Sequence, residues 1–404
     1  MSREKGSGLM WIIAGASICA AGIGIWEKRR HQKNINALPL RININGIRGK
    51  STVTRLIMGV VKEAEYKAVG KTTGTDARMI YWDTDEEAPI PRKPQGPNIG
   101  EQKKVIQEAV ERGANAMVSE CMAVKPEYQI IFQEQLLQAN IGVIVNVLED
   151  HMDVMGPTLD EVADAFTATI PHNGHLIITN DQYSDFYKQI AKKRNTRVII
   201  ADNTKITESY LRSFEYMVFP DNASLALAVA EAIGIDEETA FKGMLNAPPD
   251  PGAMRILQIQ QNDPEQRSYF VNGFAANDAS STLSIWDRVK QIGYPTEKPI
   301  VVMNCRADRV ERTEQFALDV LPYIKAEHLV LIGETTSPIV QEFEKGNLPY
   351  EQFHNLEHFT TEEIMDILIP ISEGRTIYGI GNIHGAAEPL IEQLKLVKAP
   401  KLVS

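Results

Sequence analysis

Residues 42–52 read IleAsnIleAsnGlyIleArgGlyLysSerThr, an alternating apolar strand that runs directly into a turn bracketed by glycines. Gly46 and Gly49 let the backbone turn tightly enough to direct its N–H groups inward. Lys50 can then reach the terminal phosphates of a nucleotide, and the hydroxyl of Ser51 can bind magnesium. The run that follows reads as a helix whose positive N-terminus faces the anion. This order of elements predicts an α/β domain that binds a nucleoside triphosphate.

The match to the common phosphate-binding motif is incomplete. Ile44 stands where that motif has a further glycine. A strand, turn and helix without phosphate contact is therefore the alternative. The consecutive residues Lys50, Ser51 and Thr52 favour nucleotide binding over that alternative.

The 404 residues provide enough chain for roughly two domains. Beta-branched runs alternate with helical patterns, which is typical of parallel sheets with crossover helices. Clustered Pro and Gly over residues 246–255 indicate a boundary or hinge. We therefore expect an anchor with a basic flank over 1–33, an ATP-binding α/β domain over 34–255, and a smaller Rossmann-like domain over 256–404. The expected strands are residues 40–45, 66–70, 114–120, 141–147, 174–180, 197–202, 267–274, 299–305, 328–334 and 376–381.

Helical periodicity is clear in two segments between these strands. Residues 100–112 form one, and residues 158–170 form the other, which opens with a Thr158/Glu161 capping box. Residues 83–98 are rich in Pro and acidic side chains, so we expect a long loop there.

Residues 9–26 are uncharged and are followed at once by a basic stretch. About 18 residues is short for a membrane-spanning helix and long for a signal-peptide core. More positive charge follows the segment than precedes it, which places the large C-terminal part in the cytoplasm. We predict an uncleaved single-pass anchor in the cell membrane. A helix lying in the membrane interface is the alternative, and Trp11 and Trp26 suit either placement.

The charge and cysteine content exclude several classes of protein. The net charge of −11 argues against a nucleic-acid partner, and a polyanionic ligand would need a local basic patch. The three cysteines, Cys19, Cys121 and Cys305, lie far apart, which argues against a disulfide framework or a zinc site and fits a reducing compartment.

Acidic residues and a histidine follow two of the expected strands. Glu120 ends the first strand, and Asp150, His151 and Asp153 follow the next. Ligands of open α/β sheets bind at the carboxyl edge, where these side chains would meet. Glu120 could bind the magnesium ion that Ser51 also contacts, and a solvent-exposed acid is the alternative. His151 is a candidate metal ligand, although magnesium prefers oxygen.

These motifs together resemble those of the Mur ligases and folylpolyglutamate synthetases, in the same order, over residues 40 to about 395. Within that superfamily the chain resembles the ligase subunits of bacterial poly-γ-glutamate capsule synthases. The motifs that carry the resemblance are AsnGlyIleArgGlyLysSerThr (45–52), ThrThrGlyThrAspAla (72–77), Glu120, AsnValLeuGluAspHisMetAsp (146–153), IleThrAsnAsp (178–181), ProAspAsnAlaSerLeuAlaLeuAla (220–228), MetAsnCysArgAlaAspArg (303–309) and TyrGlyIleGlyAsnIleHisGly (378–385).

The resemblance implies ATP-dependent amide ligation through an acyl phosphate, with ATP and Mg²⁺ bound. It implies that Lys50 binds the ATP phosphates and that Ser51 and Glu120 bind one magnesium. It also implies that His151 binds a second magnesium near the acyl acceptor. Asn222 matches the asparagine that lies on the adenine side of the nucleotide.

Two carried-over motifs depart from the family pattern. The family has Gly-Arg directly, whereas here two residues separate Gly252 from Arg255, the candidate catalytic and nucleotide-binding arginine. Asn277 and Asp278 resemble a motif of the C-terminal domain that faces the site, but Asn272 stands where the family has an aspartate.

A further departure concerns the helix after the Asp-His motif. Many relatives carry a carbamoylated lysine there, whereas this chain has AlaPheThrAlaThr at residues 165–169. The resemblance therefore implies that magnesium or the acyl phosphate is held in another way.

A polyglutamate chain would need cations that the average composition does not supply. Arg306, Arg309 and Arg312 follow one strand of the C-terminal domain and are candidates for binding such a substrate. A surface cluster of ion pairs is the alternative. The acids available for it are Asp308, Glu311 and Glu314.

We predict a membrane-anchored ligase that activates a glutamyl γ-carboxylate with ATP and joins it to the amine of glutamate, building poly-γ-glutamate. Its expected partners are glutamate, the growing polymer, the membrane and the other membrane subunits of a synthase and export complex. A homo-oligomer is left open. The alternatives are a P-loop ATPase that powers export of an anionic polymer and a ligase of the folylpolyglutamate type.

Overall fold

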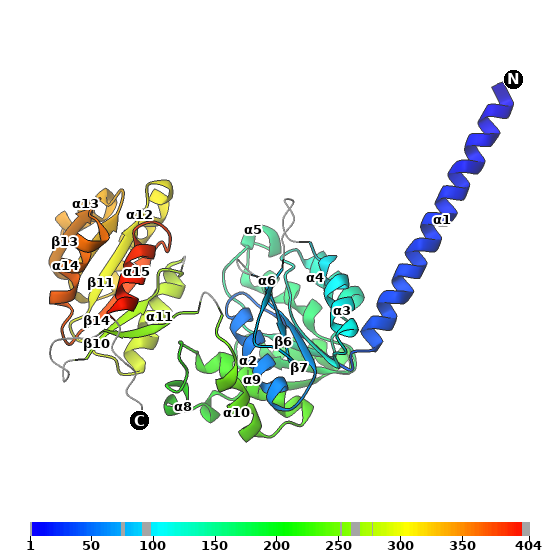
Figure 1. The fold of residues 1–404 in the computed structure, drawn as a ribbon, viewed down its shortest axis with the longest axis horizontal. Coiled ribbons are helices and arrows are strands. Elements are labelled where there is room, and N and C mark those ends of the chain that lie inside the picture. Colours follow the sequence, from blue (N-terminus) through cyan, green and yellow to red (C-terminus); the bar gives the residue numbers. More distant parts are fainter. Residues whose placement is uncertain are drawn as a thin grey trace. The chain divides into compact units, whose positions relative to one another are not determined.

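The computed structural model describes residues 2–73, 77–90, 98–250, 253–259, 267–276 and 278–397, with side chains from Ala14 onward. It divides into two compact units (Figure 1). The first contains the described residues up to Thr207 and those from Pro220 to Asp250. The second contains Glu208–Phe219 and the remaining described residues.

The first unit is built on an eight-stranded sheet with the order β4-β3-β2-β5-β1-β6-β7-β8. The strands β2, β5, β1, β6, β7 and β8 pair in parallel, in that order across the sheet. β3 and β4 extend the β2 end of the sheet with antiparallel pairing. The strands are β1 (Leu40–Asn45), β2 (Ala68–Lys71), β3 (Arg78–Tyr81), β4 (Ala88–Pro89), β5 (Ala116–Glu120), β6 (Ile141–Ile144), β7 (His175–Ile178) and β8 (Arg197–Ile200).

Helices cover both faces of this sheet, because most of its strands bury apolar residues on each face. β1 is the exception, since Ile42 and Ile44 lie on one face and the buried Asn43 and Asn45 on the other. α2, α9 and α10 pack together on one face, and α3, α6 and α7 lie on the other. The helices of the unit are α1 (Ser2–Asn36), α2 (Lys50–Glu63), α3 (Glu101–Glu111), α4 (Pro126–Ile131), the π-helical turn Phe132–Leu137, α5 (Met152–Met155), α6 (Leu159–Phe166), α7 (Ser184–Lys193), α9 (Pro220–Ile233) and α10 (Glu237–Asn246).

The second unit is built on a six-stranded sheet with the order β13-β12-β11-β14-β10-β9, parallel except for β9. Two apolar clusters fill its two faces. Its strands are β9 (Ile256–Ile259), β10 (Ser268–Asn272), β11 (Ile300–Cys305), β12 (Ala326–Gly333), β13 (Tyr350–Glu357) and β14 (Thr376–Gly381). Its helices are α8 (Glu208–Leu211), α11 (Ala279–Gln291), α12 (Val310–Asp319), α13 (Ser337–Glu344), α14 (Thr361–Ile371) and α15 (Ala387–Leu396).

These parallel-rich sheets confirm the predicted α/β fold class, and the ten expected strands occur at nearly the predicted bounds. The capping box of Thr158 and Glu161 at α6 is also confirmed. Four strands were not predicted, namely β3, β4, β9 and β13. All four lie at or next to the end of a sheet, where the apolar pattern is weakest.

Two further features differ from the expectations. The acidic stretch from residue 83 contains β4, although residues 91–97 lie outside the described part. Glu208–Phe219, expected in the ATP-binding domain, packs with the second unit. A bidentate ion pair from Arg288 of α11 to Glu208 ties this segment there.

α1 is a continuous helix over Ser2–Asn36, and its last turns pack against the first unit. His31 is buried and its Nε2 lies 3.0 Å from the carbonyl oxygen of Leu136. Side chains 15–30 are exposed. Within the residues that the structure describes, no helix combines the length and the apolarity that crossing a membrane requires.

Candidate nucleotide and metal site

The phosphate-binding loop lies at the carboxyl edge of the first sheet. β1 ends there between β5 and β6, and the chain turns into α2. Gly46 (φ 130°) and Gly49 (φ 82°) both have positive φ. A Cβ on Gly46 would lie 3.1 Å from the backbone nitrogen of Asn146. Glycine is therefore required at Gly46 by its dihedral angle and by the close approach of a second chain segment.

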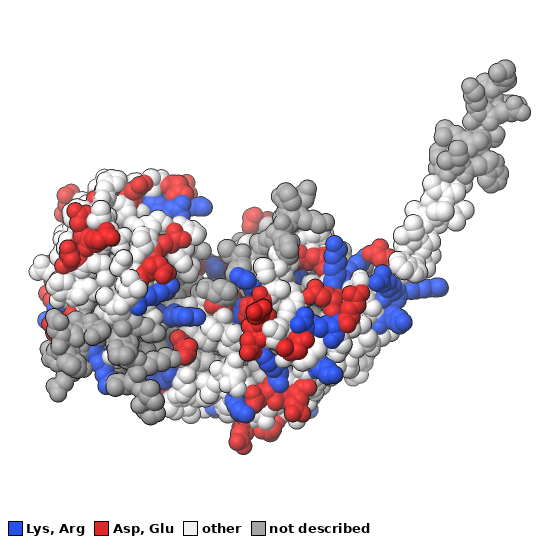
Figure 2. Space-filling model, viewed as in Figure 1, with Lys and Arg blue, Asp and Glu red and all other residues white. Residues whose placement is uncertain are grey.

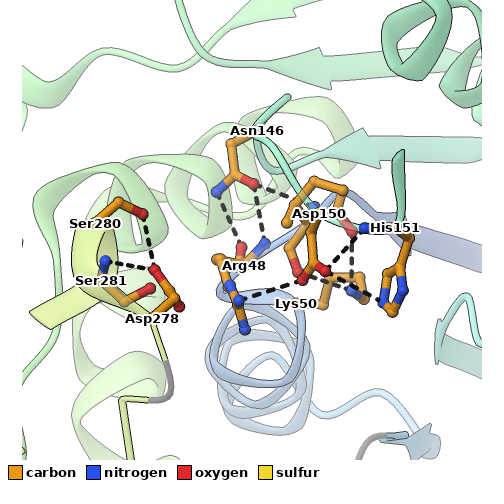
Figure 3. A network of polar contacts seen from close by, with 10 residues as sticks. Arg48, Lys50, Asn146, Asp150, His151, Asp278, Ser280 and Ser281 are labelled. Atoms are coloured by element: carbon orange, nitrogen blue, oxygen red, sulfur yellow. Dashed lines mark hydrogen bonds and ion pairs between the residues drawn. The ribbon is translucent and has the colours of Figure 1, made fainter. Parts of the chain in front are cut away.

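Asn146 holds this loop in place and was not predicted as a site residue (Figure 3). Its Oδ1 accepts hydrogen bonds from the backbone N–H groups of Ile47 (3.2 Å) and Arg48 (3.0 Å). Its Nδ2 donates to the carbonyl oxygen of Arg48 at 3.0 Å. One amide side chain thus fixes two consecutive peptide units, and only the fold brings it to a loop about a hundred residues earlier.

Lys50 begins α2 and folds back over the loop. Its Nζ donates to the carbonyl oxygens of Gly46 (2.8 Å) and Ile47 (3.0 Å), as Figure 3 shows. Gly49 provides no side-chain cap for α2, so the first N–H groups of this helix are available to an anion. The glycines, the uncapped helix start and the ammonium group fit the phosphates of a nucleotide. Thr52 lies half-buried in the same first turn.

Ser51 and Glu120 meet across β1 and β5. The Ser51 hydroxyl donates to Glu120 Oε2 at 2.8 Å, and the backbone N–H of Thr73 donates to the same oxygen at 2.8 Å. Glu120 is buried. A hydroxyl and a carboxylate beside a phosphate loop fit Mg²⁺, which takes oxygen ligands and completes its shell with phosphates and water. Among the described residues no group of three or more His, Cys, Asp or Glu side chains could hold a metal ion.

His151 does not join this pair. It has a left-handed backbone (φ 51°) at the start of α5, and its side chain is half exposed. Its contacts are with Asp150, whose Oδ1 accepts from the His151 N–H at 2.9 Å. Asp150 Oδ2 in turn lies 3.2 Å from the Arg48 guanidinium, so Asp150 links the histidine to the phosphate loop (Figure 3). Asp153 lies in the first turn of α5.

Asn222 lies at the start of α9, against the phosphate loop. A Cβ on Gly49 would come within 2.9 Å of Asn222 Oδ1. The structure therefore brings together Asn222 and the loop, as the motif order suggests, while its contact with adenine remains a prediction.

Lys71 at the end of β2 is a buried charge that was not predicted. Its Nζ lies 2.8 Å from Glu101 Oε1 and 3.2 Å from Gln102 Oε1 on α3. Burial lowers its pKa, and the carboxylate of Glu101 opposes that shift. Burial also raises the pKa of the neighbouring Cys121 thiol to about 11, so this cysteine is uncharged and a poor nucleophile at neutral pH.

The remaining candidates belong to the second unit. Asp278 caps α11, since its Oδ1 accepts from the Ser281 N–H (2.8 Å) and from the Ser280 hydroxyl (2.8 Å). Asn277 lies outside the described residues. Arg255 is exposed immediately before β9, and its carbonyl oxygen accepts from the Asn272 N–H at 3.4 Å.

The three arginines cluster after β11. Arg306 forms a bidentate pair with Asp308 (2.9 and 2.7 Å), and Arg312 donates to Asn382 Oδ1 at 2.8 Å. Burial is the main cause that lowers the pKa of Arg312, and the charges of Arg309 and Arg306 lower it further. Arg306 and Asp308 also line a cavity of about 630 Å³ at the carboxyl edge of this sheet.

Comparisons with known proteins agree with this arrangement. Residues 44–247 match the family model described as the Mur ligase middle domain, and residues 256–396 match the poly-gamma-glutamate synthase CapB C-terminal domain. The chain is 72% identical over 395 residues to PGA synthase CapB of Bacillus subtilis (strain 168), covering 98% of this chain and 100% of that protein. It is 65% identical over 390 residues to capsule biosynthesis protein CapB of Bacillus anthracis, covering 96% and 84%.

Solved structures show the same fold at low identity. MurF from Acinetobacter baumannii has a TM-score of 0.60 at 15% identity, covering 91% of this chain and 78% of that one. E. coli FolC, in complex with DHPP and ADP, has a TM-score of 0.60 at 12% identity, covering 92% of each chain. The two family models and the two closely similar relatives show that this chain belongs to the CapB family of poly-γ-glutamate synthases, which have the Mur ligase fold.

Proposed function

We propose that this chain uses ATP to join the γ-carboxylate of a glutamyl residue to the amine of glutamate, which builds poly-γ-glutamate. The observation that carries the proposal is the Ser51–Glu120 contact beside the phosphate loop, in a chain 72% identical to a PGA synthase. The fold supports the same conclusion, since MurF and FolC share it.

The chemistry needs activation because a carboxylate is a poor electrophile at neutral pH. A γ-carboxylate oxygen attacks the γ-phosphorus of ATP, the bond to ADP breaks, and an acyl phosphate forms. The neutral amine of glutamate then attacks the acyl carbon, phosphate leaves, and the amine loses a proton as the amide forms. Charge repulsion between carboxylate and triphosphate is the main obstacle to the first step.

The residues at the carboxyl edge of the first sheet would reduce this charge repulsion. Lys50 supplies a cation within reach of the loop, and the uncapped start of α2 supplies backbone N–H groups. Mg²⁺, when bound, offsets phosphate charge and orients the triphosphate. Ser51 and Glu120 are the groups that would hold it, and the Thr73 N–H keeps the Glu120 carboxylate turned toward Ser51.

Four site assignments are part of the proposal. His151 binds a second magnesium near the acyl acceptor, and its half-exposed side chain is accessible for that role. Asn222 contacts the adenine side of ATP, which its place against Gly49 supports. Arg255 contacts the nucleotide, and its exposed side chain is accessible for that contact. Asp278 contributes to the acceptor region, although its observed role is to cap α11.

The arginine cluster is the proposed contact for the anionic substrate in the second unit. Arg306 lines the 630 Å³ cavity, and its pairing with Asp308 is exposed enough for a substrate carboxylate to compete. Asp308 is the acid that pairs with Arg306, as the surface-cluster alternative expects for that residue. The carboxylates of glutamate or of the growing polymer are the matching ligands.

We also propose that α1 attaches the enzyme to the cell membrane with the catalytic part in the cytoplasm, in contact with further membrane subunits. Ile18, Ile23 and Trp26 are 72%, 64% and 61% exposed on this helix. Figure 2 shows the described part of α1 free of charge until a group of basic side chains near its base. Protease protection in sealed vesicles distinguishes a helix that spans the membrane from one that lies in its interface.

The test of the ligase function is glutamate-dependent ADP formation with trapping by hydroxylamine, with partner subunits supplied. The wild-type chain should yield a glutamyl hydroxamate, because the acyl phosphate is intercepted. Lys50→Ala should abolish the hydroxamate, whereas Lys62→Ala, on the exposed end of the same helix, should not. Rapid ATP hydrolysis without hydroxamate would contradict the ligase and favour the export ATPase.

A further inference from the structure

A second concave surface of the first unit lies at the opposite edge of its sheet, where β6, β7 and β8 begin. It is a cavity of about 720 Å³, bounded by the last residues of α9 and by the last turns of α7. Ile141, His175 and Arg197 are register partners at the starts of the three strands, so they lie side by side. The phosphate loop follows the other end of β1, so this groove is separate from the candidate nucleotide site.

The groove concentrates positive charge in a chain whose net charge is −11. Lys188 and Lys192 are four residues apart on α7 and therefore lie on one face of that helix. Together with Arg197 they place three cations in the lining, which contains no acidic side chain. Lys188 pairs with the exposed Asp185 at 2.9 Å, whereas Lys192 and Arg197 have no acidic partner among the described residues. Burial and Arg197 lower the pKa of His175, so it adds no charge at neutral pH.

The lining also contains apolar and amide side chains. Leu40, Ile141 and Ile233 contribute the apolar ones, although Leu40 and Ile141 are only 7% and 2% exposed. Asn173 and Asn195 contribute amides, and Asn195 Nδ2 donates to Asn173 Oδ1 at 2.9 Å. The groove therefore combines cations and amides with a smaller apolar contribution.

Lysines in the last turn of a helix commonly stabilise its macrodipole, and that effect accounts for Lys192 and Lys193 of α7. It does not account for Arg197, which begins a strand. It also does not account for the absence of acids from a lining of this size. An anionic ligand explains these features together.

We propose that this groove binds the γ-linked polyglutamate chain itself, as a holding site away from the catalytic edge. The proposal rests on the proposed function. Each γ-linked residue carries one carboxylate and two backbone methylenes, so the polymer presents regularly spaced anions to Lys188, Lys192 and Arg197 and short apolar segments to side chains such as Ile233. Bound polymer stays near the enzyme between additions, which favours longer chains.

The direct test is the binding of preformed, fluorescently labelled γ-polyglutamate to the full chain, followed by anisotropy at moderate salt. Lys192→Glu should weaken binding about tenfold, because it replaces an attraction by a repulsion of similar size. Lys193→Glu is the matched control, since it makes the same change in the same helical turn outside the lining, and should alter binding less than about twofold. Arg197→Gln removes a second cation without adding an acid and should weaken binding several-fold. Thermal unfolding of each variant separates lost binding from lost folding.

The outcomes distinguish this site from the function it rests on. Wild-type protein that forms no glutamyl hydroxamate but binds polymer through Lys192 contradicts the ligase and leaves the groove intact. Equal binding by wild type and both groove variants overturns the groove. Binding of vesicles containing anionic lipid, lost in Lys192→Glu while polymer binding is retained, also overturns it in favour of a membrane contact. Shorter polymer from Lys192→Glu than from Lys193→Glu supports it.

Discussion

The carboxyl edges of the two sheets hold their polar groups in different ways. In the first unit, Glu120 is buried and accepts hydrogen bonds from Ser51 and from a backbone N–H, and Asn146 fixes the loop through peptide groups. In the second unit, Arg306 relies on an exposed ion pair with Asp308. Buried, hydrogen-bonded groups suit the binding of a ligand in one fixed geometry, whereas several neighbouring arginines suit a polymer with many equivalent carboxylates. We therefore expect that single substitutions at the first edge abolish most of the activity, whereas those at the second edge reduce it gradually.

The largest effect is expected for Glu120→Gln. The amide keeps the shape but removes the charge that would hold magnesium beside Ser51. We expect hydroxamate formation to fall about 10²- to 10³-fold, or about 3–4 kcal/mol. The measurement is a magnesium titration of activity, with the exposed Glu127→Gln as control. An unchanged magnesium midpoint would remove Glu120 from the metal site.

Gly59→Ala tests the support beneath the phosphate loop. A Cβ on Gly59 of α2 would lie 2.1 Å from the carbonyl oxygen of Gly243 on α10, so the two helices would have to move apart. We expect a loss of about 1–3 kcal/mol in the free energy of unfolding, followed by denaturant titration. Gly24→Ala on α1 is the control, because a Cβ there has no atom within 4 Å. This substitution should cause no measurable loss in the free energy of unfolding. Equal stability of Gly59→Ala and wild type would show that the helices can separate freely.

Arg312→Ala tests the graded behaviour of the second edge. Its guanidinium donates to Asn382 Oδ1 and lies near two other cations. We expect KM for the glutamyl acceptor to rise about tenfold with a smaller change in kcat, since the neighbouring arginines remain. Arg375→Ala, at the other end of the same sheet, is the control. A fall in kcat with constant KM would give Arg312 a role in the chemical step.

Two capping boxes allow the support of the two units to be compared directly. Thr158 with Glu161 caps α6 in the first unit, and Thr360 with Glu363 caps α14 in the second. Thr158→Ala and Thr360→Ala should each lower the free energy of unfolding by about 1 kcal/mol. A loss confined to one variant would show that only one of the two units limits stability.

The smallest effect is a pH dependence of the second unit. Nδ1 of His328 lies 3.1 Å from Nε2 of His354, and burial lowers the pKa of both side chains. Near neutral pH both are uncharged in the folded and unfolded states. As the pH falls below about 6.5, the unfolded state takes up protons first, so stability should decrease. Unfolding titrations from pH 7.5 to 5.5 should show this decrease, and His328→Gln should reduce it.

Sequence alone determined ten of the fourteen strands of the described residues in their order, and the main candidate residues of the first site. Apolar periodicity located the central strands, and residues 46–52 with Glu120 led to the prediction of a phosphate and magnesium site. These features depend on local pattern, which a single chain displays directly. The motif series also indicated the family, which the similar relatives show.

Tertiary structure decided which distant residues meet. Asn146 holds the loop in place, Thr73 orients Glu120, and Lys71 is buried against α3. Thr73 and Asn146 lie within recognised motifs, but the motifs do not say which distant group each residue contacts. The edge strand β13 was missed because one of its sides lacks a partner strand and its sequence is largely polar. β3 was missed because it has only four residues, too few to display a pattern. The groove at the start of β8 likewise exists only because α7 and α9 end beside it. Contacts of this kind arise from the crossing of segments far apart in sequence, and their geometry is fixed by packing rather than by local preference.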